Sequence, residues 1–285
     1  MTDSRRYREI GVTPLSKALG AQIDGVDLTQ PLSDSVMQEL KDAFATYSVI
    51  FFRDQSLSPQ QHIDLAEQWG EININRFFKP LDGYPQIAEV IKAPDQKENI
   101  GGTWHTDHSY DQIPAMGSML YARQVPPAGG DTLFASMTLA FEALSDGMKK
   151  TLLGLNAWHS SRHAFGYGVS DSEHYEDGRL ANPELAVQDA LHPVIITHPL
   201  SGKKALYVNA DFTVRFDGWT TEESQPLLDF LYAHGAREEF TCRFEWQEGS
   251  IALWDNRATW HNAMNDYHGH RRVMHGITLE GVALQ

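Results

Sequence analysis

The chain has 285 residues, 41% of them hydrophobic, which is enough for one large domain with a sizeable core. Its formal net charge of −15 argues against nucleic acid and anionic membranes as partners, but not against a small anionic substrate in a local basic pocket. The single cysteine, Cys242, excludes an intramolecular disulfide and is typical of a reducing compartment. No long apolar run or apolar signal core is present, so the sequence predicts a cytoplasmic protein.

The first part of the chain predicts short strands and two amphipathic helices. Residues 1–9 are polar and predict a flexible tail. The elements expected after it are short strands within 12–28, a helix that follows Ser33, a buried strand at 49–52, a helix from Pro59 to Gly70, a loop over 73–82 and a strand at 87–91.

The rest of the chain predicts many short strands between turns. Expected are strands at 118–123 and 132–135, short helices within 136–154, a hairpin around Ser201-Gly202, a capped helix at 220–235, and strands at 240–246, 251–254 and 272–279. Residues 166–189 are polar and predict a mobile flap or surface insert. Because strands and helices do not alternate regularly, we predict a single mostly β domain over 1–285, a double-stranded β-helix (jelly roll) with helices packed outside.

One stretch, Trp104-His105-Thr106-Asp107, places a histidine and a carboxylate two residues apart. In an extended backbone such side chains point to the same side and can bind one metal ion. A second pair, His62-Ile63-Asp64, lies in the second predicted helix, where the two side chains diverge. We therefore interpret that pair as exposed helix surface and keep only the first as a candidate site.

A third candidate ligand, His261, follows a predicted strand late in the chain. Two histidines and one carboxylate leave several positions of a metal open, as in non-haem Fe(II) enzymes that activate O2. The same ligand types also occur in zinc hydrolases. His261 taken alone is equally compatible with an ordinary core histidine, so the residue types leave these alternatives open.

The surrounding segments resemble the taurine dioxygenase (TauD/TfdA) family of Fe(II)/2-oxoglutarate-dependent oxygenases, in family order and spacing from Val12 to Glu280. The matching segments are Trp104-His105-Thr106-Asp107, Gly129-Gly130-Asp131-Thr132-Leu133, His198-Pro199-x-Ser201-Gly202, Leu206-Tyr207-Val208-Asn209, Trp254-Asp255-Asn256-Arg257, and His261 followed by Asp266-Tyr267 and Arg271-Arg272-x-Met274-His275.

The resemblance implies that His105, Asp107 and His261 hold iron. It also implies that Arg272 and Thr132 bind the distal carboxylate of 2-oxoglutarate, and a guanidinium suits that task because its paired donors match a carboxylate. The implied reaction uses O2 and converts 2-oxoglutarate to succinate and CO2 while a small organic substrate is hydroxylated. A homo-oligomer is implied as well.

Arg271 is the alternative to Arg272 as the 2-oxoglutarate ligand. In the predicted strand 272–279, alternate side chains share a face, and Arg271 would point away from the face that carries Arg272. We therefore assign the role to Arg272.

The substrate residues are less constrained. By resemblance, Phe165, Phe212 and Trp254 line the pocket, although each is also compatible with ordinary core. The positions that hold taurine in the family correspond here to Asn75, Phe78, Gly101 and Gly276. Glycine in place of an arginine at 276 removes the charge-assisted anchor for a sulfonate, so we expect poor activity on taurine.

Two kinds of substrate remain open within the family. The first is an acid, with Arg76 or Lys79 as its candidate anchor, since residues 78–85 resemble a loop of phenoxyalkanoate-cleaving members; alkyl sulfates and sulfonates belong to the same class. Either basic residue is also compatible with a solvated loop charge. A larger or less charged substrate would instead fill the space at Gly276. Outside the family, the alternatives are a zinc hydrolase and a non-catalytic jelly-roll binding protein.

Overall fold

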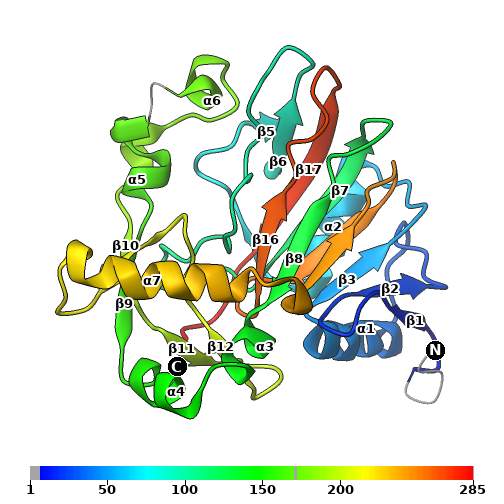
Figure 1. Cartoon of the computed structure of the whole chain (residues 1–285). Helices are drawn as coiled ribbons and strands as arrows, with labels where there is room; N and C mark the ends of the chain where they lie inside the picture. The colour runs from blue at the N-terminus through cyan, green and yellow to red at the C-terminus, as the bar shows by residue number, and fades with distance from the viewer. Residues whose placement is uncertain (1–6, 170–171, 285) are drawn as a thin grey trace.

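The protein is described by a computed structural model that covers residues 7–169 and 172–284. Two mainly antiparallel sheets of unequal size face each other, with helices on the outside (Figure 1). The large sheet has the strand order β1-β2-β3-β15-β7-β17-β6-β5, with β4 paired to β17, and only β2 and β3 run parallel. Its strands are β1 (Gly11–Pro14), β2 (Ala21–Asp24), β3 (Val49–Phe52), β4 (Ile72–Asn73), β5 (Pro80–Leu81), β6 (Tyr84–Lys92), β7 (Gly117–Gln124), β15 (Ile251–Asp255) and β17 (Arg272–Leu279).

The small sheet that faces it has the order β14-β8-β16. Its strands are β8 (Thr132–Ser136), β14 (Thr241–Phe244) and β16 (Thr259–Ala263). Two further antiparallel groups lie beside it and contain β9 (Asn156–Ser160), β10 (Asp189–Pro193) and β13 (Thr213–Phe216), and β11 (Ile195–Thr197) with β12 (Lys204–Leu206). This arrangement is the predicted jelly roll.

Aromatic side chains fill the space between the two sheets. Phe51 on β3 stacks on Phe244 of β14 with ring centroids 4.0 Å apart, and it meets Phe134 of β8 at 5.6 Å. Phe134 in turn lies 5.7 Å from Trp254 on β15. These rings are buried because alternate residues of each strand point inward, and they hold the sheets together next to the candidate site.

The helices cover the outer faces of the sheets. Helix α1 (Asp34–Tyr47) begins at the N-cap Ser33, and α2 (Pro59–Trp69) begins at a capping box between Ser58 and Gln61. On the other side α7 (Thr221–Gly235) begins at a second capping box, formed by Thr220 and Glu223. The shorter helices are α3 (Met137–Glu142), α4 (Asp146–Leu152), α5 (Arg162–Phe165) and α6 (Glu173–Glu176).

The end of α7 packs so closely on the small sheet that its last residue has to be glycine. A Cβ atom at Gly235 would lie 2.5 Å from the Trp260 ring of β16. That ring is buried, and its Nε1 donates to the Val208 carbonyl at 2.9 Å, so it has no room to move aside. The contact fixes the distance between α7 and the strand that carries His261.

Two sequence expectations need correction or limits. Tyr7, placed in the flexible tail 1–9, is buried in the core, and the Arg8 and Glu9 backbone N–H groups donate to the Glu39 carboxylate. Residues 1–6 of that tail lie outside the described residues. The segment 166–189 contains α6 and short 3₁₀ turns over its described part, 166–169 and 172–189, and its role as a flap stays a prediction.

His62 was expected on exposed helix surface, and this is wrong. The side chain is buried, because His62, Leu65, Ala66 and Trp69 form one i, i+3, i+4, i+7 stripe that faces the large sheet, while Asp64 is exposed. The imidazole meets the Tyr121 ring edge-on at 5.7 Å, and neither of its nitrogens has a hydrogen-bond partner among the described residues. Burial, with smaller effects of His275 and Arg123, lowers the pKa of His62 to about 3.

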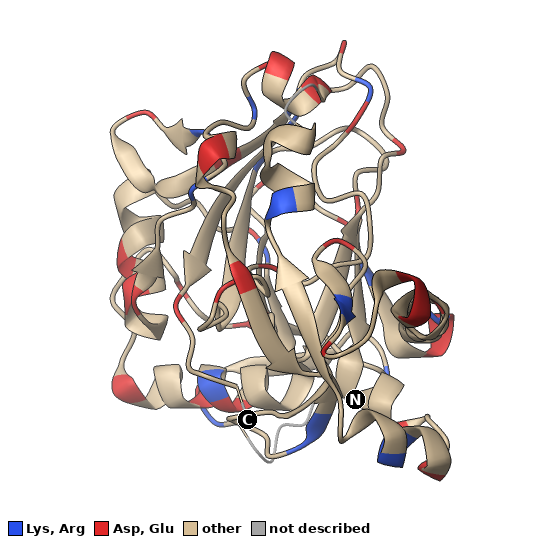
Figure 2. Cartoon of the chain, turned by 90° about the vertical axis from the view of Figure 1, so that its left-hand side faces the viewer, with Lys and Arg blue, Asp and Glu red and all other residues tan. Residues whose placement is uncertain are grey.

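The surface agrees with the acidic composition. Figure 2 shows Asp and Glu positions distributed over the helices and loops around the sheets, with Lys and Arg scattered among them. Within residues 7–169 and 172–284, no helix has the length and apolar character needed to cross a membrane.

The buried His62 predicts a pH-dependent stability. Because its pKa falls from about 6.5 in the unfolded chain to about 3 in the folded one, stability is lost as pH falls below 6.5. Between pH 7.5 and 5.0 the loss from this group is about 2 kcal/mol. Urea unfolding at both pH values measures the free energy of unfolding. Its decrease from pH 7.5 to pH 5.0 should be about 2 kcal/mol smaller in His62→Leu than in the unmodified chain. The exposed His268→Leu is the matched control, and equal losses in all three proteins would refute the assignment.

Candidate metal centre

The site is built by a backbone contact between two distant segments. His105 lies in the loop between β6 and β7, and His261 lies on β16. The His105 N–H donates to the His261 carbonyl at 3.1 Å, and the His261 N–H donates to the His105 carbonyl at 2.8 Å, which forms an isolated antiparallel bridge. The two imidazole centroids are consequently only 4.1 Å apart.

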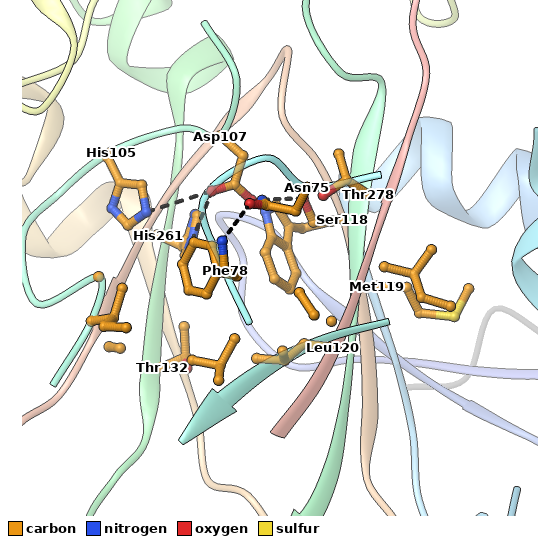
Figure 3. Close-up of a pocket in the computed structure, with 18 of the residues that line it drawn as sticks. Asn75, Phe78, His105, Asp107, Ser118, Met119, Leu120, Thr132, His261 and Thr278 are labelled. Carbon is orange, nitrogen blue, oxygen red and sulfur yellow. Dashed lines mark hydrogen bonds and ion pairs between the residues drawn. The ribbon is translucent and has the colours of Figure 1, made fainter. Parts of the chain in front are cut away.

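This bridge holds the loop extended, so Asp107 points to the same side as His105. Its Oδ1 lies 3.6 Å from His105 Nε2 and 3.8 Å from His261 Nε2 (Figure 3). The three ligand atoms all lie within 4.8 Å of one another. Since metal–ligand bonds to imidazole and carboxylate are about 2.0–2.2 Å long, one transition-metal ion fits between them.

Neighbouring groups orient two of the three ligands. The second oxygen of Asp107, Oδ2, accepts a hydrogen bond from Ser118 Oγ at 2.6 Å, and Ser118 is itself held by Asn256 Nδ2 at 3.0 Å. His105 Nδ1 donates to the Thr103 carbonyl at 2.8 Å, which leaves Nε2 as the unprotonated nitrogen. Such outer contacts set the tautomer and direction of metal ligands.

The electrostatics keep the cluster ready for a cation. Burial lowers the pKa of His261 to about 3, with a further lowering by His105. Burial acts to raise the pKa of Asp107, but His261, His105 and the Ser118 hydrogen bond together bring it below its usual value. Both groups therefore carry free lone pairs at neutral pH, the state that metal binding requires. His261 Nδ1 is buried without a hydrogen-bond partner in the described part of the chain.

A first cavity of about 120 Å³ adjoins the cluster and contains Arg272 at the start of β17. Arg272 is 5% exposed, and its Nε and Nη2 have no hydrogen-bond partner within the described residues. A buried guanidinium without an anion is costly, so the cavity fits a ligand that brings a carboxylate. Thr132 lines the same cavity, and because its Oγ1 accepts from Trp246 Nε1 at 2.9 Å, its hydroxyl hydrogen is free to be donated.

A second cavity of about 350 Å³ also adjoins the ligands. The two cavities share part of their walls, and the residues that line both are Asn75, Phe78, Ile100, Gly101, His105, Asp107 and His108. The walls that belong only to the second cavity are mostly aromatic or histidine and come from the 110, 163–180 and 210–212 segments. They are Tyr110, His163, Ala164, Phe165, His174, Leu180, Ala210, Asp211 and Phe212.

The structure brings most of the expected substrate residues together. Asn75, Phe78, Trp254 and Gly276 line the first cavity. Phe165 and Phe212 line the second. A Cβ atom at Gly276 would meet Leu120 Cδ1 at 3.6 Å, an ordinary contact, so the position has room for a Cβ atom.

The two basic candidates lie elsewhere. Lys79 is exposed and lines a separate shallow pocket over residues 79–85 and 89, so it does not belong to the walls of either cavity. Arg76 donates to both carboxylate oxygens of Asp111 at 2.7 Å and is absent from both linings. Both were proposed from a loop pattern, and that pattern cannot show which way a loop side chain points.

Sequence reasoning missed three residues of the site. Ser118 supports Asp107, Asp211 lines the second cavity, and His108 lines both. His108 has a left-handed backbone with φ of 55°, which turns the chain directly after the metal ligand. His108 and Asp211 each adjoin a residue or segment that had been singled out, but nothing in one sequence shows that they face a cavity.

Comparison with known proteins agrees with this geometry. The family model described as "Taurine catabolism dioxygenase TauD, TfdA family" matches residues 11–278. The chain is 34% identical to an alkylsulfatase of Acinetobacter baylyi, with 96% of this chain and 86% of that protein covered. It is 31% identical to an alpha-ketoglutarate-dependent 2,4-dichlorophenoxyacetate dioxygenase of Cupriavidus pinatubonensis, with 94% and 96% covered.

A solved structure is similar over the same length. The crystal structure of a taurine dioxygenase from Burkholderia xenovorans superimposes with a TM-score of 0.82 at 34% identity, covering 97% of this chain and 91% of that one. The family match, the relatives and the two-sheet fold thus point to one conclusion. The chain belongs to the TauD/TfdA family and is a 2-oxoglutarate-dependent dioxygenase, an oxidoreductase that acts on a small molecule.

Proposed function

We propose that His105, Asp107 and His261 bind Fe(II), and that Arg272 and Thr132 bind the distal carboxylate of 2-oxoglutarate in the first cavity. The observation that carries this proposal is the guanidinium of Arg272, which is buried in the cavity beside the three ligands and whose Nε and Nη2 have no partner among the described residues. A dicarboxylate can bind the metal through one end and pair with Arg272 through the carboxylate at its other end, so it accounts for the ligand cluster and for the buried guanidinium together.

When bound, Fe(II) supplies the redox chemistry that couples O2 and the decarboxylation of 2-oxoglutarate to hydroxylation of the substrate. The chain's own residues bind and orient. Ser118 holds the Asp107 carboxylate so that Oδ1 faces the metal position, and Thr103 holds His105 with Nε2 toward it. The rings of Phe165 and Phe212 line the second cavity, and the ring of Trp254 packs beside His261. Together these apolar surfaces exclude water from the space around the substrate and the metal.

The two alternative classes fit the site less well. A zinc hydrolase would use the same three ligands but gives no role to Arg272, whose burial would remain uncompensated. A non-catalytic jelly-roll protein gives no role to the ligand cluster or to its supporting hydrogen bonds. The cytoplasmic location and the homo-oligomeric state stay predictions.

The substrate is a small organic molecule bound in the second cavity and against Asn75, Phe78 and Gly276. We infer that taurine is a poor substrate, because no arginine stands at position 276 and because Arg76 and Lys79 are absent from the cavity walls. The relatives named above are an alkylsulfatase and a 2,4-dichlorophenoxyacetate dioxygenase, so alkyl sulfates and phenoxyalkanoates are the first anionic compounds to compare.

The role of Arg272 predicts a specific loss. Arg272→Met should weaken 2-oxoglutarate binding by about 100-fold or more, because the cosubstrate carboxylate loses its charged partner in a buried site. The measurement is anaerobic titration of the visible charge-transfer band that forms with Fe(II) and 2-oxoglutarate. Arg271→Met, at an exposed neighbour, is the matched control and should bind as the unmodified chain does. The assignment fails if both variants bind equally well, and the zinc-hydrolase alternative gains if no band forms although iron binds.

The ligand assignment predicts graded metal affinities. Asp107→Ala should abolish substrate-coupled succinate formation and weaken metal binding strongly. Ser118→Ala should retain binding with an affinity lowered about 10-fold, since only the orientation of Asp107 is lost. Titration with Mn(II), followed by the electron paramagnetic resonance signal of the free ion, measures both. Full succinate production by Asp107→Ala would contradict the assignment.

The space at Gly276 predicts a gain of binding. Taurine should cause no shift of the anaerobic band at millimolar concentration with the unmodified chain. Gly276→Arg should bring about a shift with an affinity at least about 10-fold higher, because it restores a charge-assisted partner for the sulfonate. Gly276→Met, which fills the space without charge, is the control. A low Michaelis constant for taurine in the unmodified chain would refute the inference.

A further inference from the structure

We propose that the second cavity selects a substrate with a positively charged ammonium group, and that the Asp211 carboxylate is its counter-charge. This inference rests on the proposed function and names the substrate class for the same site. Three observations support it. The cavity wall presents a carboxylate, it contains several aromatic rings, and no lysine or arginine belongs to its described lining.

Asp211 offers the second cavity a free carboxylate oxygen. Its Oδ1 accepts a hydrogen bond from Thr103 Oγ1. Its Oδ2 lies 3.6 Å from His105 Nδ1, but that nitrogen donates its hydrogen to the Thr103 carbonyl instead. Within the described residues no lysine or arginine pairs with Asp211, whose side chain is 25% exposed. One oxygen of a negative group thus stays available to a ligand.

A second polar group of the cavity wall is the imidazole of His108, which is held by the carboxylate of Asp111. His108 Nδ1 lies 3.1 Å from Asp111 Oδ2, and Arg76 donates to both oxygens of the same carboxylate. His108 lines both cavities, and its Nε2 makes no hydrogen bond to the described part of the protein, so it is free to contact a ligand.

Three aromatic rings complete the wall. Tyr110 lies edge-on to Phe212 at 4.9 Å and to Phe165 at 6.0 Å, and Phe165 lies 5.9 Å from Phe212. Ring faces attract cations, and a group of rings beside a carboxylate is a common way to bind an ammonium ion. Phe212 directly follows Asp211 in the chain, and both residues line the second cavity.

The described lining of the second cavity has no fixed positive charge that would bind an anion. No lysine or arginine belongs to its described lining, and Arg272 lines only the first cavity. Burial, with a further effect of Arg179, lowers the pKa of His174, which leaves that imidazole uncharged at neutral pH. His163 is an exposed imidazole, and Asn75 offers a single uncharged amide. An ionised sulfate would meet the negative Asp211 here without a fixed positive partner.

The test uses the full chain, loaded anaerobically with Fe(II) and 2-oxoglutarate, and three probes with one common body. The probes are 3-phenylpropylammonium, 3-phenylpropyl sulfate and 3-phenylpropan-1-ol, and their affinities come from the shift of the charge-transfer band. We expect the ammonium to bind at least about 10-fold more tightly than the sulfate. Succinate formed under O2 then shows which bound probe triggers turnover.

Asp211→Asn should lower the affinity for the ammonium by about 10-fold or more and leave that for the alcohol within about 2-fold, because only the charge is removed. Asp211→Glu keeps the charge and should keep the preference. Asp82→Asn, on the exposed turn between β5 and β6, is the control for the loss of one negative charge and should match the unmodified chain. Thermal unfolding checks that each variant is folded.

Three results would overturn the proposal: tighter binding of the sulfate, no binding of the ammonium, or an equal loss for all three probes in Asp211→Asn. The last would show that Asp211 only positions His105. Failure of the proposed function is separate, because it appears before any probe is added, as the absence of the band with Fe(II) and 2-oxoglutarate. In that case calorimetric titration of the same probes into the metal-free chain still decides the preference for the ammonium.

Discussion

The two backbone hydrogen bonds between His105 and His261 are the contact on which the site depends. They join a loop to the edge of the small sheet and so bring together residues that lie far apart in the chain. They also impose an extended backbone at His105, which is the conformation that turns Asp107 to the same side. A loop free of this bridge would have no reason to keep the three ligand atoms within 4.8 Å of one another. The close packing of Gly235 on Trp260 acts on the same strand from the outside.

The folded chain holds unpaired charge and close imidazoles that a bound ligand would relieve. Within residues 7–169 and 172–284 no anionic side chain pairs with the buried Arg272, and His105 and His261 face each other across the Asp107 carboxylate. Features of this kind lower stability, and proteins keep them where a ligand compensates. Binding to the folded state alone also stabilises it by mass action, so metal and cosubstrate contribute to folding as well as to chemistry.

Sequence reasoning succeeded where a local rule determines the direction of a side chain. The spacing of His105 and Asp107 predicts a shared face in an extended backbone, and strand alternation separates the buried Arg272 from the exposed Arg271. The capped helices and the hairpin at 194–208 were predicted for the same reason. The jelly roll followed from many short strands without regular helices between them.

It failed where the direction depends on distant packing. His62 was read by its spacing to Asp64, but its burial follows from the i, i+3, i+4, i+7 stripe that meets the large sheet. Lys79 lies directly before β5 and lines a separate pocket together with the turn between β5 and β6. The exposure of Asp211 to a cavity follows from the pairing of β9 and β13 and from Thr103, neither of which a single sequence reveals.

The two cavities beside one metal position share Asp107 but differ in their second charged residue, and this difference can sort their ligands. The first cavity offers the guanidinium of Arg272, whereas the second offers the carboxylate of Asp211. A dianion such as 2-oxoglutarate is attracted to the first and repelled by the second, so Asp211 disfavours occupation of the substrate side by the cosubstrate. A cation has the reverse preference. Specificity then comes as much from the repulsion of the wrong ligand as from the attraction of the right one. An anionic substrate, by contrast, would compete with 2-oxoglutarate for Arg272, the one cationic side chain in the described lining of either cavity.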